Sequence, residues 1–405
     1  MNRDNSNRTL ERTLAGVTIG HALHDSWYGV APVLLAAMSA LPTFGLTNSD
    51  IGLILLFYQA ISSVTQPFFG RLSERMGGRW LGVGAIIWTT LMFSGAVLAP
   101  SKLFVAICVA LAGFGSGAWH PQGTANATIA GGKRYGATAA ALFFTGGTLG
   151  TALLGSALGG FLLDKYGRQS LLLIAVLVLF VTLTVVRQII PNEPTAVKKA
   201  VASGHSNGRD RTFWVILSLL LGGIALRSLT NTSLTTYIPK YYQDLGASPA
   251  TYGGAMSLFL VAVAIGGVVG SYLADRIGLQ RVLAISLSLS ALCLFGFLRA
   301  DGMWSYVLLA LLGFWIGPSH TLFVVAGQRR FPERMAMMAG VFLGFTFVSG
   351  AGGAWVLGLV ADHLGLKAVL SILPWALFAA AGCALLSVPN KSPEAATEPE
   401  RVPAA

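Results

Sequence analysis

The sequence predicts an all-α membrane protein whose twelve transmembrane helices form two pseudo-symmetric six-helix halves. Three observations lead to this fold class. Of the 405 residues, 54% are hydrophobic and only 11% are charged, which is too apolar for soluble domains of this length. The apolar residues are gathered into separate runs, each of helix length. Finally, segments of the first half of the chain recur in the second half.

Each apolar run is long enough to cross a bilayer, since a membrane-spanning helix needs about 20 residues. Strands do not fit, because an open sheet cannot span lipid and a barrel strand alternates polar and apolar residues. The first run is also too long for a cleavable signal peptide. In chain order the predicted spans are 13–40, 50–70, 80–99, 103–130, 137–163, 169–190, 212–238, 250–274, 282–300, 303–327, 335–361 and 368–388.

The polar segments between these spans set the orientation. With a cytoplasmic N-terminus, 20 of the 27 Lys and Arg residues fall on the inner side and 6 on the outer side, while Arg227 lies inside a span. The positive-inside rule therefore predicts a protein of the inner (plasma) membrane with both termini in the cytoplasm. The remaining predicted parts are an N-terminal tail (1–12), two six-helix bundles (13–190 and 212–388), a cytoplasmic linker (191–211) and a C-terminal tail (389–405).

The charge and the cysteines exclude several function classes. A net charge of +11 is accounted for by the inner loops, so we expect a lipid bilayer around the chain and no nucleic-acid partner. The three cysteines, Cys108, Cys293 and Cys383, stand alone inside apolar runs, so neither a disulfide framework nor a metal site is expected. The glycine-rich strings lack the Gly-Lys-Ser/Thr ending of a phosphate-binding loop. We therefore expect a monomer without a cofactor that is driven by a gradient.

Two repeats relate the halves. The segment Ala110–His120 recurs 200 residues later as Ala310–His320, with six of eleven positions identical. In addition, an acid, a base and a glycine close four of the spans, at Glu74–Gly77, Asp164–Gly167, Asp275–Gly278 and Asp362–Gly365. The predicted topology places the first and third copies inside and the other two outside. Inverted repeats of this kind are typical of secondary transporters.

At these residues the chain resembles the major facilitator superfamily, and the resemblance covers essentially its whole length. The segment Gly70–Arg79 is similar to the superfamily's loop between helices two and three, with Glu74 in place of the usual Asp. Further strings resemble one branch, the fosmidomycin-resistance proteins: residues 62–67, 115–121, 130–136 and 339–345. This resemblance implies the major facilitator fold, in which the first helix of each three-helix unit lines a central cavity.

The chain also departs from that branch. It has His120-Pro121-Gln122 where the branch usually has His-Pro-Glu, and His24-Asp25 where the branch has Asn-Asp. In the fifth span, Gly155–Gly160 resembles the superfamily's antiporter motif but has Ser156 for its proline.

Asp25 is the only carboxylate well inside a predicted span. A charged group at mid-bilayer costs about 2.5–3.5 kcal/mol on insertion scales, so such a residue is usually retained for function. Asp25 and its neighbour His24, whose imidazole titrates near neutral pH, are therefore the predicted proton-coupling residues. The alternative is a structural ion pair between Asp25 and Arg227. We expect His21 to be a packing residue.

Arg227 is the predicted anion ligand, because a guanidinium binds carboxylate or phosphonate through two parallel hydrogen bonds. His120 and His320 are symmetry mates in the repeat and are predicted donors to substrate, with helix packing as the alternative. The other predicted substrate-binding residues are Gln122, Asn126 and Asn231. The charged residues near the loop motifs are predicted to latch one conformational state: Glu74, Arg75, Arg79, Asp275, Arg276 and Arg281.

Together these patterns predict a proton-coupled secondary transporter that exports a small drug-like or anionic metabolite by alternating access. The alternative is an uptake symporter for a small organic acid, with the same fold and the flux reversed. A membrane-embedded, lipid-modifying enzyme is disfavoured, because the chain shows no nucleophile with a neighbouring base.

Overall fold

The computed structural model describes residues 3–76, 78–190, 211–330 and 335–388, and every regular element within them is a helix. Eleven helical segments in this part of the chain are long and apolar enough to cross a membrane. The predicted fold class of an all-helical membrane protein is therefore confirmed. The predicted C-terminal tail and nearly all of the predicted linker lie outside the described residues.

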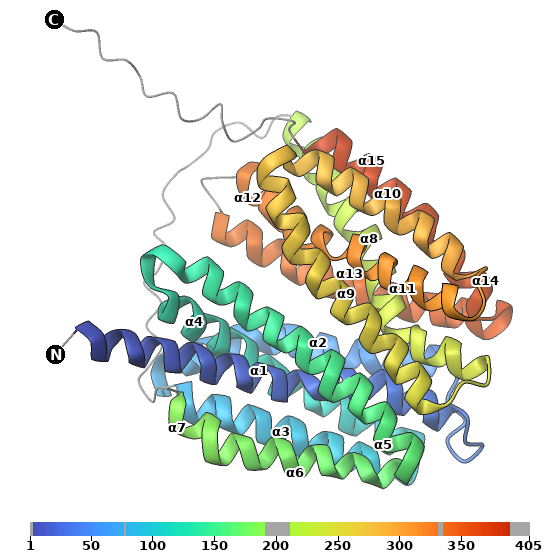
Figure 1. Ribbon diagram of the computed structural model, residues 1–405, viewed down its shortest axis with the longest axis horizontal. Coiled ribbons are helices and arrows are strands. Elements are labelled where there is room, and N and C mark those ends of the chain that lie inside the picture. Colours follow the sequence, from blue (N-terminus) through green and yellow to red (C-terminus); the bar gives the residue numbers. More distant parts are fainter. Residues whose placement is uncertain (1–2, 77, 191–210, 331–334, 389–405) are drawn as a thin grey trace, which may run out of the picture. The chain divides into compact units, whose positions relative to one another are not determined.

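The elements follow the predicted spans closely (Figure 1). In the first half they are α1 (Arg3–Ser39), α2 (Asn48–Met76), α3 (Gly78–Leu98), α4 (Lys102–Leu149), the π-helix η1 (Gly150–Leu158), α5 (Gly159–Tyr166), η2 (Arg168–Leu171), α6 (Leu172–Val181), η3 (Thr182–Val186) and α7 (Arg187–Ile189). In the second half they are α8 (Arg211–Asp244), α9 (Pro249–Ile277), α10 (Leu279–Phe297), α11 (Met303–Ile316), α12 (Pro318–Arg330), α13 (Met335–Leu364), α14 (Leu366–Leu370) and α15 (Leu373–Ser387).

Helix α1 covers the first predicted span but is absent from the eleven apolar segments. Its polar residues His21, His24 and Asp25 lower the hydropathy of its central turns. The helix already begins at Arg3, so most of the predicted N-terminal tail continues α1.

The helix labelled α4 is broken at one glycine, between the fourth and fifth spans. Gly132 has φ 61° and ψ −162° inside the segment labelled α4, a backbone conformation that glycine adopts without steric cost. The chain turns there, and the two membrane-length segments are Lys102–Gly132 and Thr138–Tyr166. This agrees with the predicted spans 103–130 and 137–163.

Glycines let α1 approach the fifth span closely. A Cβ atom added at Gly150 would collide with the backbone of Ala22, and one added at Gly155 would collide with the carbonyl oxygen of Ser26. The hydroxyl of Thr151 donates to the carbonyl of Asp25 at 3.1 Å. The absence of a side chain at these two positions therefore permits the close packing of the two helices.

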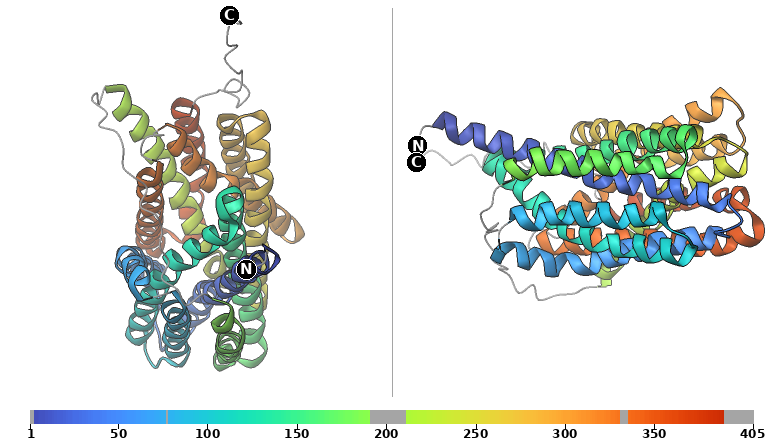
Figure 2. Two further views of the ribbon diagram at one scale, coloured as in Figure 1. Left: turned by 90° about the vertical axis from the view of Figure 1, so that its left-hand side faces the viewer. Right: turned by 90° about the horizontal axis from the view of Figure 1, so that it is seen from below.

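Contacts divide the chain into two compact units. Unit 1 comprises Met1–Ala200, Asn231–Val261 and Phe347–Leu370, and unit 2 comprises Val201–Thr230, Ala262–Thr346 and Ser371–Ala405. Within unit 1, α1, α2 and α3 each pack on α4, and α3 lies beside α6 (Figures 1 and 2). Within unit 2, α10 packs on α11 and α15.

Unit 1 includes all of α14 and parts of three other second-half helices, α8, α9 and α13. The Tyr237 hydroxyl contacts two carbonyl oxygens, that of Asn48 at 3.1 Å and that of Ala354 at 2.8 Å. Gly160 of α5 packs against the backbone of Gly253 in α9. The division into bundles 13–190 and 212–388 thus remains a prediction.

Candidate functional site

Three histidines surround the carboxylate of Asp25 in unit 1; these four residues, His21, His24, Asp25 and His120, are called the histidine–aspartate cluster below. One helical turn separates His21 from Asp25, and His21 Nε2 lies 3.0 Å from Asp25 Oδ2. His24 Nδ1 lies 2.8 Å from Asp25 Oδ1. His120 comes from α4, and its Nε2 is 3.8 Å from the same Oδ1. The cluster therefore joins α1 to α4.

Two side chains of the cluster are buried and two are partly exposed. The side chains of His21 and His24 are 2% and 0% exposed, whereas those of Asp25 and His120 are 17% and 25% exposed. The carboxylate and the α4 imidazole can thus exchange a proton with water while the other two rings are enclosed by protein.

Backbone carbonyls fix the tautomers of two histidines. His21 Nδ1 is 2.8 Å from the carbonyl oxygen of Phe143, and His120 Nδ1 is 2.9 Å from that of Ser116. Because a carbonyl oxygen only accepts, each Nδ1 must carry a proton and donate. In the neutral rings, both Nε2 atoms then carry lone pairs. These two atoms are 3.3 Å apart and both face the Asp25 carboxylate. The arrangement is attractive only when a positive charge lies among the three groups.

His24 orients the carboxylate. Its Nδ1 donates to Asp25, and its Nε2 lies 3.2 Å from the hydroxyl of Thr89 in α3. The ring stacks on Trp119 with 6.2 Å between centroids. The sequence prediction paired His24 with Asp25, and the structure brings these two together.

The structure assigns two further histidines to Asp25 that the sequence prediction placed elsewhere. His21 was expected to be a packing residue; it does stack on Phe143, with centroids 3.9 Å apart, but it also pairs with Asp25. Its i,i+4 spacing from Asp25 was the available signal.

His120 was predicted to bind substrate beside Gln122 and Asn126. Those two side chains instead lie on another face of α4, where Gln122 packs against Gly78 and Gly82 of α3 and its carbonyl accepts from Asn126.

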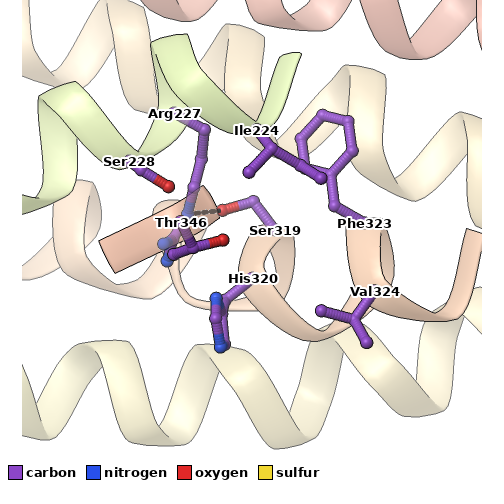
Figure 3. Close-up of a pocket in the computed structure, with 8 residues that line it drawn as sticks. All are labelled: Ile224, Arg227, Ser228, Ser319, His320, Phe323, Val324 and Thr346. Atoms are coloured by element: carbon purple, nitrogen blue, oxygen red, sulfur yellow. Dashed lines mark hydrogen bonds between the residues drawn. The ribbon is translucent and has the colours of Figure 1, made fainter. Parts of the chain in front are cut away.

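A second polar site lies in unit 2, around Arg227 of α8. The guanidinium is buried, with Arg227 only 6% exposed, and its Nε donates to Ser319 Oγ of α12 at 2.8 Å. Figure 3 shows the Arg227 side chain reaching between Ser228, Ser319 and Thr346, with His320 beside them. The full lining is Ile224, Arg227, Ser228, Ser319, His320, Phe323, Val324 and Thr346. This group is called the arginine pocket below.

The described residues of the arginine pocket include hydrogen-bond donors but no carboxylate. Among the described residues, no carboxylate lies within the 4 Å ion-pair distance of Arg227, and Ser228 Oγ is buried without a hydrogen-bond partner. An uncompensated buried guanidinium is unfavourable, so the site suits an anion. Sequence reasoning found Arg227 and His320 but missed Ser228 and Ser319. Asn231, also predicted, belongs to unit 1, and its Oδ1 has no partner among the described residues.

Asp25 and Arg227 each bond within their own unit. Asp25 pairs with histidines of unit 1, and Arg227 binds a serine of unit 2. The alternative of an ion pair between Asp25 and Arg227 stays a prediction.

The predicted gate residues remain predictions. The side chain of Glu74 lies outside the described residues, and Arg75, Asp275, Arg276 and Arg281 are exposed. Arg79 donates to the carbonyl of Ile190 at 2.7 Å, which ties α3 to the end of the sixth span. The sequence prediction missed a contact of Asp362, in the fourth copy of the acid–base–glycine motif, whose carboxylate accepts from the N–H groups at the start of α2.

Comparisons with known proteins agree with this architecture. The model of the major facilitator superfamily matches residues 18–354 and, in a second match, 220–404. The chain is 30% identical over 374 residues to the fosmidomycin resistance protein of Escherichia coli, covering 90% of each chain. It is 26% identical over 292 residues to a multidrug resistance protein of Salmonella typhimurium, covering 69% of this chain and 70% of that one.

The fold also matches a solved transporter structure. This is a bacterial homologue of the human lysosomal transporter Spinster in an inward-facing, unoccupied conformation. Its TM-score is 0.73 at 15% sequence identity, and the match covers 94% of this chain and 97% of that one.

Proposed function

The chain belongs to the major facilitator superfamily, and from that premise we propose that it is a proton-coupled exporter of a small drug-like or anionic molecule, working by alternating access. The chain is a membrane transporter and not an enzyme, as its family and fold indicate. The proposal concerns the coupling ion, the substrate and the direction.

The proposed proton coupling rests on the histidine–aspartate cluster. It holds one carboxylate and two Nε2 lone pairs whose nearest atoms lie 3.0, 3.3 and 3.8 Å apart, so a proton placed among them is stabilised by all three. Partial exposure of Asp25 and His120 allows that proton to enter and leave. Asp25 and His24, the predicted coupling residues, would then act with His21 and His120 as one protonation site.

The proposed anionic substrate rests on the hydrogen-bond donors of the arginine pocket. The hydrogen bond that the guanidinium donates to Ser319 uses Nε, so this bond leaves both Nη groups for a ligand. A carboxylate or phosphonate can accept two parallel bonds from such a fork, and the Ser228 hydroxyl would find a partner in the same ligand. Ile224, Phe323 and Val324 line the same pocket with apolar side chains.

Export is supported by two relatives that are named as resistance proteins. One observation favours the alternative, an uptake symporter for a small organic acid. A protonated cluster makes the cavity helices more positive, which favours anion binding, and two species that load together move in the same direction. The direction of flux therefore has to be measured.

Transport into everted membrane vesicles separates these possibilities. Vesicles acidified inside by respiration should accumulate fosmidomycin if the protein exchanges external drug for internal protons, and an uncoupler should abolish the uptake. Vesicles containing Asp25→Asn protein serve as the control. Uptake that needs no gradient, or drug loss driven by proton efflux, would overturn the export proposal; the second result would establish symport.

A further inference from the structure

We infer that His21, Asp25 and His120 form a binding site for a divalent transition-metal cation of the Zn²⁺ type. The inference rests on atom positions and is independent of the proposed direction and coupling. Two imidazole nitrogens and a carboxylate converge, and their ligand atoms all lie within 4.8 Å of one another. The nitrogens favour a transition metal over Mg²⁺ or Ca²⁺, which prefer oxygen ligands.

The distances to His21 fit a tetrahedral ion. With Zn–N bonds of about 2.0–2.1 Å, the ligand atoms of a tetrahedral site lie about 3.3 Å apart. Here His21 Nε2 is 3.0 Å from Asp25 Oδ2 and 3.3 Å from His120 Nε2. His120 Nε2 is nearest to the other carboxylate oxygen, Oδ1, at 3.8 Å. Binding of the ion would therefore draw the partly exposed side chains of Asp25 and His120 closer together, from ligand atoms that now lie within 4.8 Å of one another.

Each ligand is already held in a metal-binding orientation. His21 and His120 donate their Nδ1 protons to the carbonyls of Phe143 and Ser116, which leaves Nε2 as the free lone pair. His24 donates to the Asp25 carboxylate. Metal-binding histidines and carboxylates in proteins are typically oriented by this type of outer hydrogen bond.

The fourth position would be open. Protein supplies three ligands, and the cluster is reached by solvent on the side of Asp25 and His120, whose side chains are 17% and 25% exposed. Water or an oxygen of a transported anion could therefore complete the coordination, as in sites with three protein ligands. The bound cation would supply the positive charge that the two Nε2 lone pairs and the carboxylate require.

The test uses purified full-length protein in detergent, with its affinity tag removed, and Co²⁺ as a spectroscopic substitute for Zn²⁺. No gradient is present, so failure of metal binding is distinguishable from failure of transport coupling. We expect one equivalent of Co²⁺ to give the intense visible absorption of a tetrahedral site, and one equivalent of Zn²⁺ to abolish it.

Variants then locate the metal. His120→Gln and Asp25→Asn should each weaken Co²⁺ binding by more than about a hundredfold, since loss of a ligand exceeds the loss caused by an outer hydrogen-bond partner. The control is His363→Gln, which removes an exposed histidine at the end of α13 and should leave binding unchanged. Two ligand variants are used so that misfolding of one, detected by gel filtration, leaves the other decisive. Weak, octahedral absorption in the unmodified protein, or a tetrahedral signal that survives in a folded ligand variant, would overturn the inference.

Discussion

Asp362 Oδ1 accepts a hydrogen bond from the backbone N–H of Asn48 at 2.7 Å, which joins the end of α13 to the first residue of α2. Asp362 Oδ2 accepts a second bond from the N–H of Ser49 at 3.1 Å. A carboxylate at a helix N-terminus satisfies free N–H groups and interacts favourably with the helix dipole. The Tyr237 hydroxyl meanwhile binds the carbonyl of Asn48 at 3.1 Å. Helix α2 is thus held at its start by two second-half residues.

The first prediction is that Asp362→Asn loosens this end of unit 1. Loss of a capping carboxylate costs about 1 kcal/mol, which corresponds to roughly a fivefold change in a two-state equilibrium. Spin labels on cysteines that replace the exposed residues Leu41 and His363 report the distance between the loop before α2 and the end of α13. In Asp362→Asn, the population in which the two labels are farther apart should increase by that factor. The matched control is Asp50→Asn, which removes a second carboxylate at the start of α2, one that accepts from the Thr47 N–H at 3.1 Å and pairs with Lys102 at 3.0 Å, both first-half residues. Equal distance distributions in Asp362→Asn and the parent protein would show that Asp362 does not hold α2 to α13.

The second prediction is topological. The 20 to 6 distribution of basic residues predicts that the segment 191–211 is cytoplasmic. After replacement of Cys108, Cys293 and Cys383, a cysteine introduced at Ser203 should resist an impermeant maleimide in intact cells and react after permeabilisation. A cysteine at Asp301, in a predicted outer loop, should react in intact cells. The reverse pattern would invert the orientation of every span.

The third prediction concerns Asp25→Asn. Without the carboxylate, the cluster loses the group that all three histidines face, so gradient-driven transport should fall to background. Substrate exchange across proteoliposome membranes without a gradient should remain measurable, because the arginine pocket contains no part of the cluster. Asp50→Asn again serves as the control and should retain driven transport. Concentrative uptake at the parent level by Asp25→Asn would remove this residue from the coupling mechanism.

The fourth prediction tests the arginine pocket. Arg227→Gln should weaken binding of an anionic substrate by more than about tenfold, which is about 1.4 kcal/mol and the lower end for a charged hydrogen bond. Arg227→Lys should recover part of this affinity, since a point charge attracts the anion without forming two parallel bonds. Isothermal titration with fosmidomycin provides the measurement.

A matched control for this pocket is Arg168→Gln. Arg168 also donates to a backbone carbonyl, that of Ala99 at 3.1 Å, but lies in unit 1 outside the pocket. The Arg168→Gln protein should bind the anion with the affinity of the parent protein. Tight binding of a cationic drug that is unchanged in Arg227→Gln would contradict the anion assignment.

The sequence alone determined the helices and their order, because crossing a bilayer requires long apolar runs that are visible without any tertiary information. The boundary between the spans 103–130 and 137–163 was predicted as well, and the structure places the break at Gly132. The pairing of Asp25 with His24 was predicted because the two are neighbours in the chain. The pairing of Asp25 with His21 was not predicted, although His21 is one helical turn away.

Only the tertiary structure decided which distant residues meet. His120, Gln122 and Asn126 share α4, yet the first reaches Asp25 while the other two pack toward α3. Helical residues two positions apart point about 200° apart, so the rotation of α4 against its neighbours, rather than residue type, selects the side chain that enters the site. Likewise, the four copies of the acid–base–glycine motif look alike in sequence. That Asp362 reaches Asn48 depends on how α13 packs beside α2, a relationship between helices that no local pattern encodes.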